Sequence, residues 1–149
     1  MPPGGIVLVQ DGGSLVAVAG PSVAVCLWCP DASVACMAHF ARACVYDPAL
    51  ATARFGNVAV PRAIELVREA AGDLPLEAQI FGGAACPGQD PSIASGNVDM
   101  ARRVLAARGV KVVSEDVGGA KGRKIVFHGQ SGHVAVVKVH HLREEDWNP

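Results

Sequence analysis

The chain consists of short apolar runs that end at Gly, Pro or Asp, and this spacing limits its fold more than any other feature. Most runs have the length and the β-branched content of strands. Two segments instead place apolar residues every three or four positions, which is typical of a helix with one buried face. The order of four strands, helix, strand, helix and three strands predicts an α+β fold, a mixed or antiparallel β-sheet system with two helices packed on it. The predicted strands are 6–9, 15–19, 22–28, 34–40, 76–81, 110–116, 123–127 and 133–139, and the helices are 58–71 and about 97–108.

Capping residues suggest where the two helices begin and end. Asn57 is a candidate N-cap for the first helix, and Gly72 follows its last apolar residue. Ser95 or Asn97 is a candidate N-cap for the second helix, and Gly109 is its stop. Both helices are therefore expected to lie between a polar cap and a glycine.

Length and charge indicate one domain and exclude several classes of function. The 149 residues suit a single domain, 1–149, whose polar tail 140–149 is expected to fray. A net charge of -1 argues against a generally basic nucleic-acid surface. No apolar run is long enough for membrane insertion, and the first residues lack the charge pattern of a signal peptide. We therefore expect a cytoplasmic protein whose five cysteines are thiols or ligands rather than disulfides.

Ser22 and His39 are the first candidates for chemistry, because a predicted hairpin brings them together. Residues 29–32 include Pro30 and Asp31, which suit the loop between two strands. With that loop, Ser22 lies directly opposite His39 on the same face of the hairpin. A hydroxyl beside an imidazole can form a nucleophile–base pair, and the alternative is a polar contact at a strand end.

Several segments together resemble one family, the CheD chemoreceptor glutamine deamidases of bacterial chemotaxis. The likeness extends from about Val16 to Val139, and its pieces occur in the same order as in the family. The pieces are Gly-Pro-Ser-Val-Ala-Val-Cys at 20–26, Met-Ala-His at 37–39, Arg-Phe-Gly-Asn at 54–57, Glu-Ala-Gln-Ile-Phe-Gly-Gly-Ala at 77–84, Gly-Asn-Val at 96–98, and Glu-Asp-Val-Gly-Gly at 115–119 followed by Arg123.

The resemblance implies a papain-like set of catalytic residues, and two of its three positions are changed here. In the family, a Cys nucleophile, a His base and an orienting Thr hydrolyse the side-chain amide of receptor glutamines. The His corresponds to His39, the Cys to Ser22 and the Thr to Val16, and the Ser before the nucleophile corresponds to Pro21. A serine hydroxyl cannot form the resting ion pair that a thiol forms with imidazole. Val16 has no hydroxyl to hold the ring. We therefore expect the deamidase activity to be weakened or lost, with the pocket retained.

The resemblance also suggests a substrate-binding turn and partners. Phe81, Gly82 and Gly83 follow a predicted strand, and their backbone N–H groups could form a nest for an amide or carboxylate. The alternative is a tight turn where two backbones approach closely. By resemblance, the partners are chemoreceptor cytoplasmic helices and a CheC-type phosphatase that uses the same docking face.

A zinc site is the alternative hypothesis for the cysteines. Cys26, Cys29, Cys36 and His39 have the spacing of a Cys3His site. Against it, Cys36 and His39 are an odd number of residues apart on one predicted strand, so they face opposite sides. We therefore expect no metal and no cofactor, and we expect Cys26 to be a small core residue.

Overall fold

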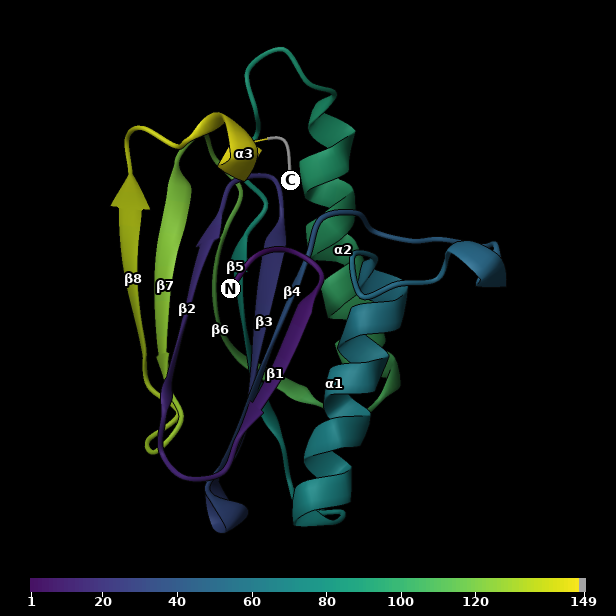
Figure 1. The fold of residues 1–149 in the computed structure, drawn as a ribbon, viewed down its shortest axis with the longest axis vertical. Helices are drawn as coiled ribbons and strands as arrows, with labels where there is room; N and C mark the ends of the chain where they lie inside the picture. Colours follow the sequence, from purple (N-terminus) through teal and green to yellow (C-terminus); the bar gives the residue numbers. More distant parts are fainter. Residues whose placement is uncertain (148–149) are drawn as a thin grey trace.

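The structure, a computed structural model, describes residues 1–147 and confirms the predicted α+β class (Figure 1). The eight predicted strands and both predicted helices are present in the expected order. A third, short helix follows the last strand. The strands are β1 (Gly5–Val9), β2 (Ser14–Ala19), β3 (Val23–Cys29), β4 (Val34–Phe40), β5 (Glu77–Gly82), β6 (Lys111–Val117), β7 (Gly122–His128) and β8 (Val134–Val139). The helices are α1 (Gly56–Ala71), α2 (Pro91–Ala107) and α3 (Glu144–Trp147), and the 3-10 turns are η1 (Pro30–Ala32) and η2 (Pro48–Leu50).

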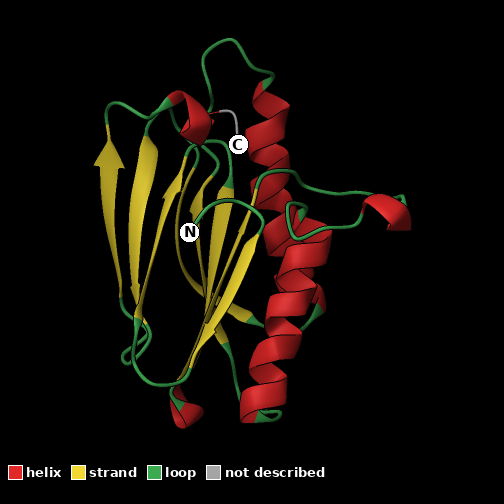
Figure 2. Ribbon diagram, in the orientation of Figure 1, coloured by secondary structure: helices red, strands yellow, loops and turns green. Residues whose placement is uncertain are grey.

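The strands form two sheets, and the larger one is covered on both faces (Figure 2). The five-stranded sheet has the order β1-β4-β3-β5-β6, in which only the β5–β6 pair is parallel. The three-stranded sheet has the order β2-β7-β8 and is antiparallel. Helices α1 and α2 cover one face of the larger sheet, and the smaller sheet covers the other. Every residue of the central strands β3 and β4 is therefore buried.

Alternate residues of β3 and β4 belong to two separate cores. Val25 and Leu27 pack toward the helices, whereas Cys26 and Trp28 pack toward the smaller sheet. This follows from the period of two in a strand, which sends neighbouring side chains to opposite faces. A side chain on either face is consequently enclosed, and a polar one there needs a hydrogen-bond partner.

Both long helices begin earlier than predicted. The two asparagines expected as caps instead hydrogen-bond to the backbone of other segments. Helix α1 begins at Gly56, and Asn57 instead exchanges two hydrogen bonds with the backbone of Val45. Helix α2 begins at Pro91, where Asp90 accepts a hydrogen bond from Ser92 N–H and is the true cap. An Asp-Pro pair before a helix is a recognised start signal that outweighs the polar residues further on.

The described part of the tail packs against the sheets at 142–147, and its fraying stays a prediction. Leu142 packs so closely against Gly122 that a Cβ there would lie 2.3 Å from its Cδ1. Helix α3 covers Gly20, where a Cβ would lie 2.7 Å from the carbonyl oxygen of Asp146. Residues 148–149 of the predicted tail lie outside the described part. Among residues 1–147, no helix is long and apolar enough to cross a bilayer.

Candidate active site

Ser22 and His39 meet, although the strand register differs from the predicted one. Ser22 Oγ lies 2.9 Å from His39 Nε2. In the observed pairing of β3 with β4, Ala24 lies opposite His39, so the prediction that Ser22 lies there is wrong. A shift by two residues leaves every side chain on its predicted face. Ser22 is therefore a diagonal neighbour of His39, within reach of a long side chain.

The loop between β3 and β4 explains the different register. Pro30–Ala32 form a 3-10 turn, and Ser33 follows in the left-handed region with φ 52. Cys29 remains in the ladder opposite Val34, so the loop occupies 30–33 instead of 29–32. A left-handed serine is uncommon, so the composition of the loop did not indicate this end point.

Both ring nitrogens of His39 have partners, and these partners determine where its proton lies. His39 Nδ1 is 3.0 Å from the carbonyl oxygen of Met1. A carbonyl can only accept, so Nδ1 carries the hydrogen and donates it. In the neutral ring Nε2 is then the acceptor, and the Ser22 hydroxyl donates to it. This is the tautomer in which a histidine can take a proton from a serine hydroxyl.

Burial sets the basicity of His39. The side chain has 0% of its surface exposed, and this desolvation lowers its pKa to about 4. The Met1 carbonyl and the Asp146 carboxylate act in the opposite direction and raise the pKa, while the positive Met1 amino group lowers it further. Desolvation is the largest of these effects. His39 is therefore neutral at pH 7 and a weak base in the closed structure.

This shift predicts that stability falls on acidification. The pKa of folded His39, about 4, lies below the ordinary histidine value of about 6.5, so the unfolded chain binds this proton first as the pH drops. Stability from neutral His39 is complete above about pH 6.5 and is lost down to about pH 4, a change of about 3 kcal/mol. Denaturant unfolding at several pH values should show this loss, and the His39→Gln variant should lack it. Equal pH slopes in both proteins would contradict the shift.

Two segments at the ends of the described chain cover the pair. Met1 contacts His39 directly, and Gly4 N–H donates to the His39 carbonyl. On the other side, α3 packs on Gly20, two residues before Ser22. Ser22 is only 1% exposed and His39 is 0% exposed. The pair is assembled but closed, so a substrate amide reaches it only if one of these segments moves.

The Val16 side chain lies on the outer face of β2, and a different group bonds the His39 imidazole. Ala17 and Ala19 of β2 point into the core between the sheets, which places the Val16 side chain on the other face, where it is 40% exposed. The Met1 carbonyl supplies the hydrogen bond that a threonine at this position was expected to supply. The sequence did not indicate Met1, because a backbone carbonyl carries no side-chain signal.

The turn after β5 is bonded to the backbone on both sides of Pro21. Gly83 N–H donates to the Ser22 carbonyl at 2.9 Å, and Ala84 N–H donates to the Gly20 carbonyl at 2.8 Å. The Gly83 donor is therefore occupied in this closed structure, and substrate binding by Phe81, Gly82 and Gly83 stays a prediction. Phe81 is buried in the core between the sheets, and Gly82 and Gly83 have positive φ of 112 and 64. This geometry is that of a tight turn between closely packed backbones, which was the alternative to a nest.

The zinc hypothesis is wrong, because the proposed ligands lie on opposite faces of the larger sheet. Cys29 and Cys36 belong to the core beneath the helices, whereas Cys26 lies in the core between the sheets. His39 shares the face of Cys26, so the sheet separates the four proposed ligands into two pairs. Within residues 1–147, no group of three or more His, Cys, Asp or Glu side chains is arranged to hold a metal. Burial raises the pKa of Cys26 far above its ordinary value, as expected of a core thiol.

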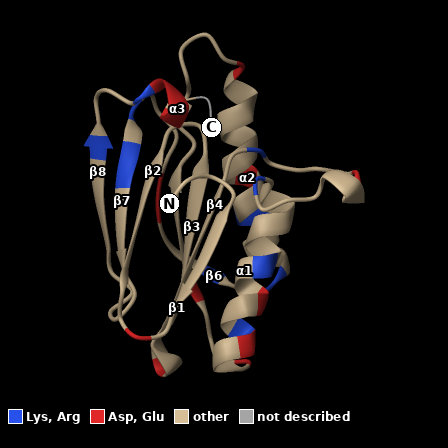
Figure 3. Ribbon diagram, viewed as in Figure 1, with Lys and Arg blue, Asp and Glu red and all other residues tan. Residues whose placement is uncertain are grey.

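An open groove adjoins the covered pair. It has a volume of about 620 Å³ and is lined by Met1, Pro2, Val16, Arg54 and Asp146 among others. Glu145 and Asp146 of its lining belong to α3, whose acidic residues are red in Figure 3. Asp146 is held there by Arg143 at 2.9 Å. Because Met1 lines the groove and also contacts His39, the groove leads to the covered side of the imidazole.

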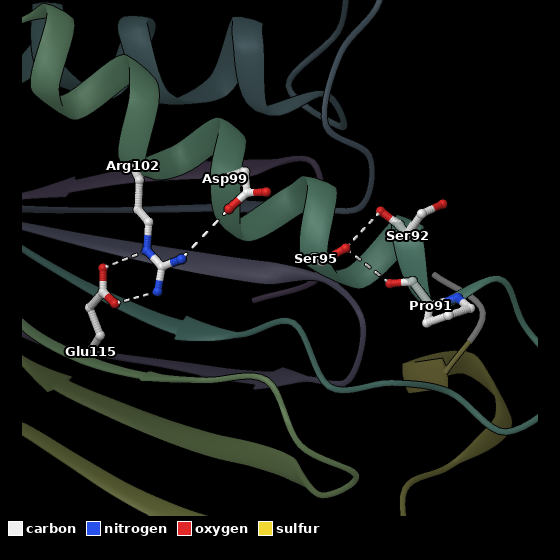
Figure 4. Close-up of polar contacts among 6 residues, drawn as sticks. All are labelled: Pro91, Ser92, Ser95, Asp99, Arg102 and Glu115. Carbon is white, nitrogen blue, oxygen red and sulfur yellow. Dashed lines mark hydrogen bonds and ion pairs between the residues drawn. The ribbon is translucent and has the colours of Figure 1, made fainter.

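A second, smaller hollow lies between α2 and the turns after β5 and β6. Its volume is about 280 Å³, and its polar lining is already paired, as Figure 4 shows. Arg102 makes two hydrogen bonds to Glu115, at 3.0 and 2.7 Å, and approaches Asp99 at 3.6 Å. Ser95 donates to the carbonyl of Pro91 at 3.2 Å. The bonds from Arg102 to Glu115 tie α2 to β6, and the other contacts lie within α2. Ser22 and His39 therefore remain the candidate site.

Comparisons with known proteins identify the family. The family model described as CheD chemotactic sensory transduction matches residues 45–138, a segment that begins after Ser22 and His39. A probable chemoreceptor glutamine deamidase CheD 1 of Anaeromyxobacter dehalogenans is 39% identical over 133 residues, covering 87% of this chain and 77% of the relative. The probable chemoreceptor glutamine deamidase CheD of Sulfurimonas denitrificans is 32% identical, covering 78% of each chain. The one of Laribacter hongkongensis is 36% identical over 144 residues, covering 92% of this chain and 70% of the relative. The chain therefore belongs to the CheD family of chemotactic sensory transduction proteins.

Proposed function

We propose that this protein is a cytoplasmic CheD-type chemotaxis protein that binds chemoreceptor helices, and that its glutamine deamidase chemistry is weakened or lost. The observation that carries the proposal is the Ser22–His39 pair itself. A hydroxyl hydrogen-bonds a neutral, buried imidazole where the family resemblance places a thiol. The names of the relatives, probable chemoreceptor glutamine deamidases, support the receptor as partner.

The geometry allows each step of deamidation to be assigned, and it supports the proposal that turnover is slow. Ser22 Oγ would attack the side-chain amide carbon of a glutamine while His39 Nε2 takes the hydroxyl proton. That proton would pass to the departing ammonia, and water would then cleave the ester to release glutamate. The first step needs a base matched to the working pH, but the pKa of His39 is about 4. Ser22 is also buried in this structure, which keeps a substrate amide away from its hydroxyl.

Ammonia release and receptor binding, measured together, test the proposal. The purified protein is mixed with a receptor cytoplasmic fragment, and ammonia is followed beside mass spectrometry of the receptor glutamines. We expect binding without ammonia release above that of the His39→Ala variant. Turnover that His39→Ala abolishes would contradict the loss of chemistry, and absence of binding by both proteins would contradict the receptor as partner.

A second partner follows from the family resemblance. A CheC-type phosphatase is proposed to dock on the same face as the receptor helices, so the two should compete. Titrating the phosphatase into the receptor complex should displace the receptor fragment. Simultaneous binding of both would contradict a shared face.

A further inference from the structure

Asn97 is a fully buried polar residue in the middle of α2. Its side chain is 0% exposed and lies among the apolar residues that pack α2 on the larger sheet, which include Ala94, Val98 and Ala101. Asparagine is a poorer helix former than alanine, and a buried amide is costly unless it is hydrogen-bonded. Alanine at this position would make the helix itself more stable. The role of Asn97 therefore lies in the groups that its amide contacts.

The Asn97 amide joins the two segments that carry Ser22 and His39. Its Nδ2 lies 2.9 Å from the Pro21 carbonyl oxygen and 3.0 Å from the Ala41 carbonyl oxygen. Both partners can only accept, so the NH2 group faces them and donates one hydrogen to each. Pro21 directly precedes Ser22, and Ala41 is the second residue after His39.

The ladder between β3 and β4 does not extend far enough to set the distance between Ser22 and His39. Pairing of β3 with β4 ends at Val23 opposite Phe40, so Ser22 lies beyond the last ladder pair. Backbone beyond a ladder can splay apart unless other groups hold it. Gly83 N–H holds the Ser22 carbonyl from the β5 side. Asn97 links the same loop to the end of β4, which is the strand that carries His39.

We propose that Asn97 is a positioning residue, which holds the Ser22 loop to the end of β4 and so sets the contact between Ser22 Oγ and His39 Nε2. Only the consequence for turnover rests on the proposed function. The effect on the His39 ring can be measured without receptor or catalysis.

Asn57 offers a matched control for loss of an asparagine clamp. It lies on the neighbouring helix α1 and also makes two side-chain hydrogen bonds, at 2.8 and 3.1 Å, but both go to Val45 in the loop after β4. An Asn57→Ala variant therefore loses the same number of bonds without touching Ser22 or His39. Both variants should lower the melting temperature.

The test follows the His39 ring by nitrogen NMR during a pH titration. In Asn97→Ala, the pKa of His39 should rise by about one unit or more toward 6.5, because a loosened pair admits water. The Nδ1–H signature should also weaken. Asn57→Ala should change neither. A folded Asn97→Ala protein with the unmodified pKa and tautomer would overturn the proposal.

Two further measurements decide the matter even if Asn97→Ala does not fold. Asn97→Ser retains one donor and should give an intermediate pKa of His39. In the unmodified protein, the Asn97 side-chain amide hydrogens should exchange with solvent at least about 100-fold more slowly than those of the exposed Gln130, because both are bonded in a buried place. Equal exchange rates, or a His39 pKa in Asn97→Ser that matches the unmodified protein, would overturn the proposal.

Discussion

The Ser22→Cys variant is expected to deamidate receptor glutamines at least about 10²-fold faster than the unmodified chain, because a thiolate is a far better nucleophile than a hydroxyl. The His39 ring nitrogen already lies 2.9 Å from the Ser22 hydroxyl oxygen, so the thiol would arrive beside its base. A thiol has an ordinary pKa near 8.5, and an adjacent imidazolium lowers it to give a thiolate. The ion pair would in turn favour protonated His39, which the hydroxyl cannot do.

Adding Val16→Thr to Ser22→Cys should change the rate little. The Val16 side chain faces away from the core, and His39 Nδ1 is already bonded to the Met1 carbonyl. Ammonia release from a receptor fragment measures all variants, and His39→Ala in the Ser22→Cys background is the control that must remove the gain. A folded Ser22→Cys protein that binds receptor, titrates a low-pKa thiol and still shows no turnover would contradict the idea that the nucleophile alone was lost.

The Gly82→Ala variant is expected to lose about 3–5 kcal/mol of unfolding free energy, the sum of backbone strain and overpacking. Gly82 has φ +112, and a Cβ there would lie 2.3 Å from the Ser22 carbonyl oxygen. That oxygen belongs to the backbone, which also accepts a hydrogen bond from Gly83, so it cannot move away easily. The substitution should therefore destabilise the fold and displace Ser22 from His39.

Gly109→Ala separates the two contributions to this loss. Gly109 also has positive φ, +67, but nothing lies within 4 Å of a Cβ built there. It should cost only the conformational strain, about 1–2 kcal/mol. Denaturant unfolding with unchanged m-values compares the two variants. Equal losses would show that the close contact between Gly82 and Ser22 carries no energetic weight.

The fold was largely predictable because its signals are local. Eight strands and two helices follow from runs and stripes that the printed sequence shows directly, and their order leads to an α+β fold. Their ends were less predictable. Asn57 and Asn97 have the chemistry of helix caps, yet tertiary contacts use them elsewhere, and the helices begin at Gly56 and Pro91.

Ser22 and His39 were predictable as a pair because side chains alternate along strands, so an error of two residues in register kept them on one face. By itself, the sequence determined the order of the elements, the two faces of the central strands and the likeness to the CheD family. Only the tertiary structure decided that Met1 orients His39, that Asn97 spans the end of the ladder and that α3 packs on the loop before Ser22. Those contacts join residues far apart in the chain, and two of them use backbone carbonyls, which are the same at every position of a sequence.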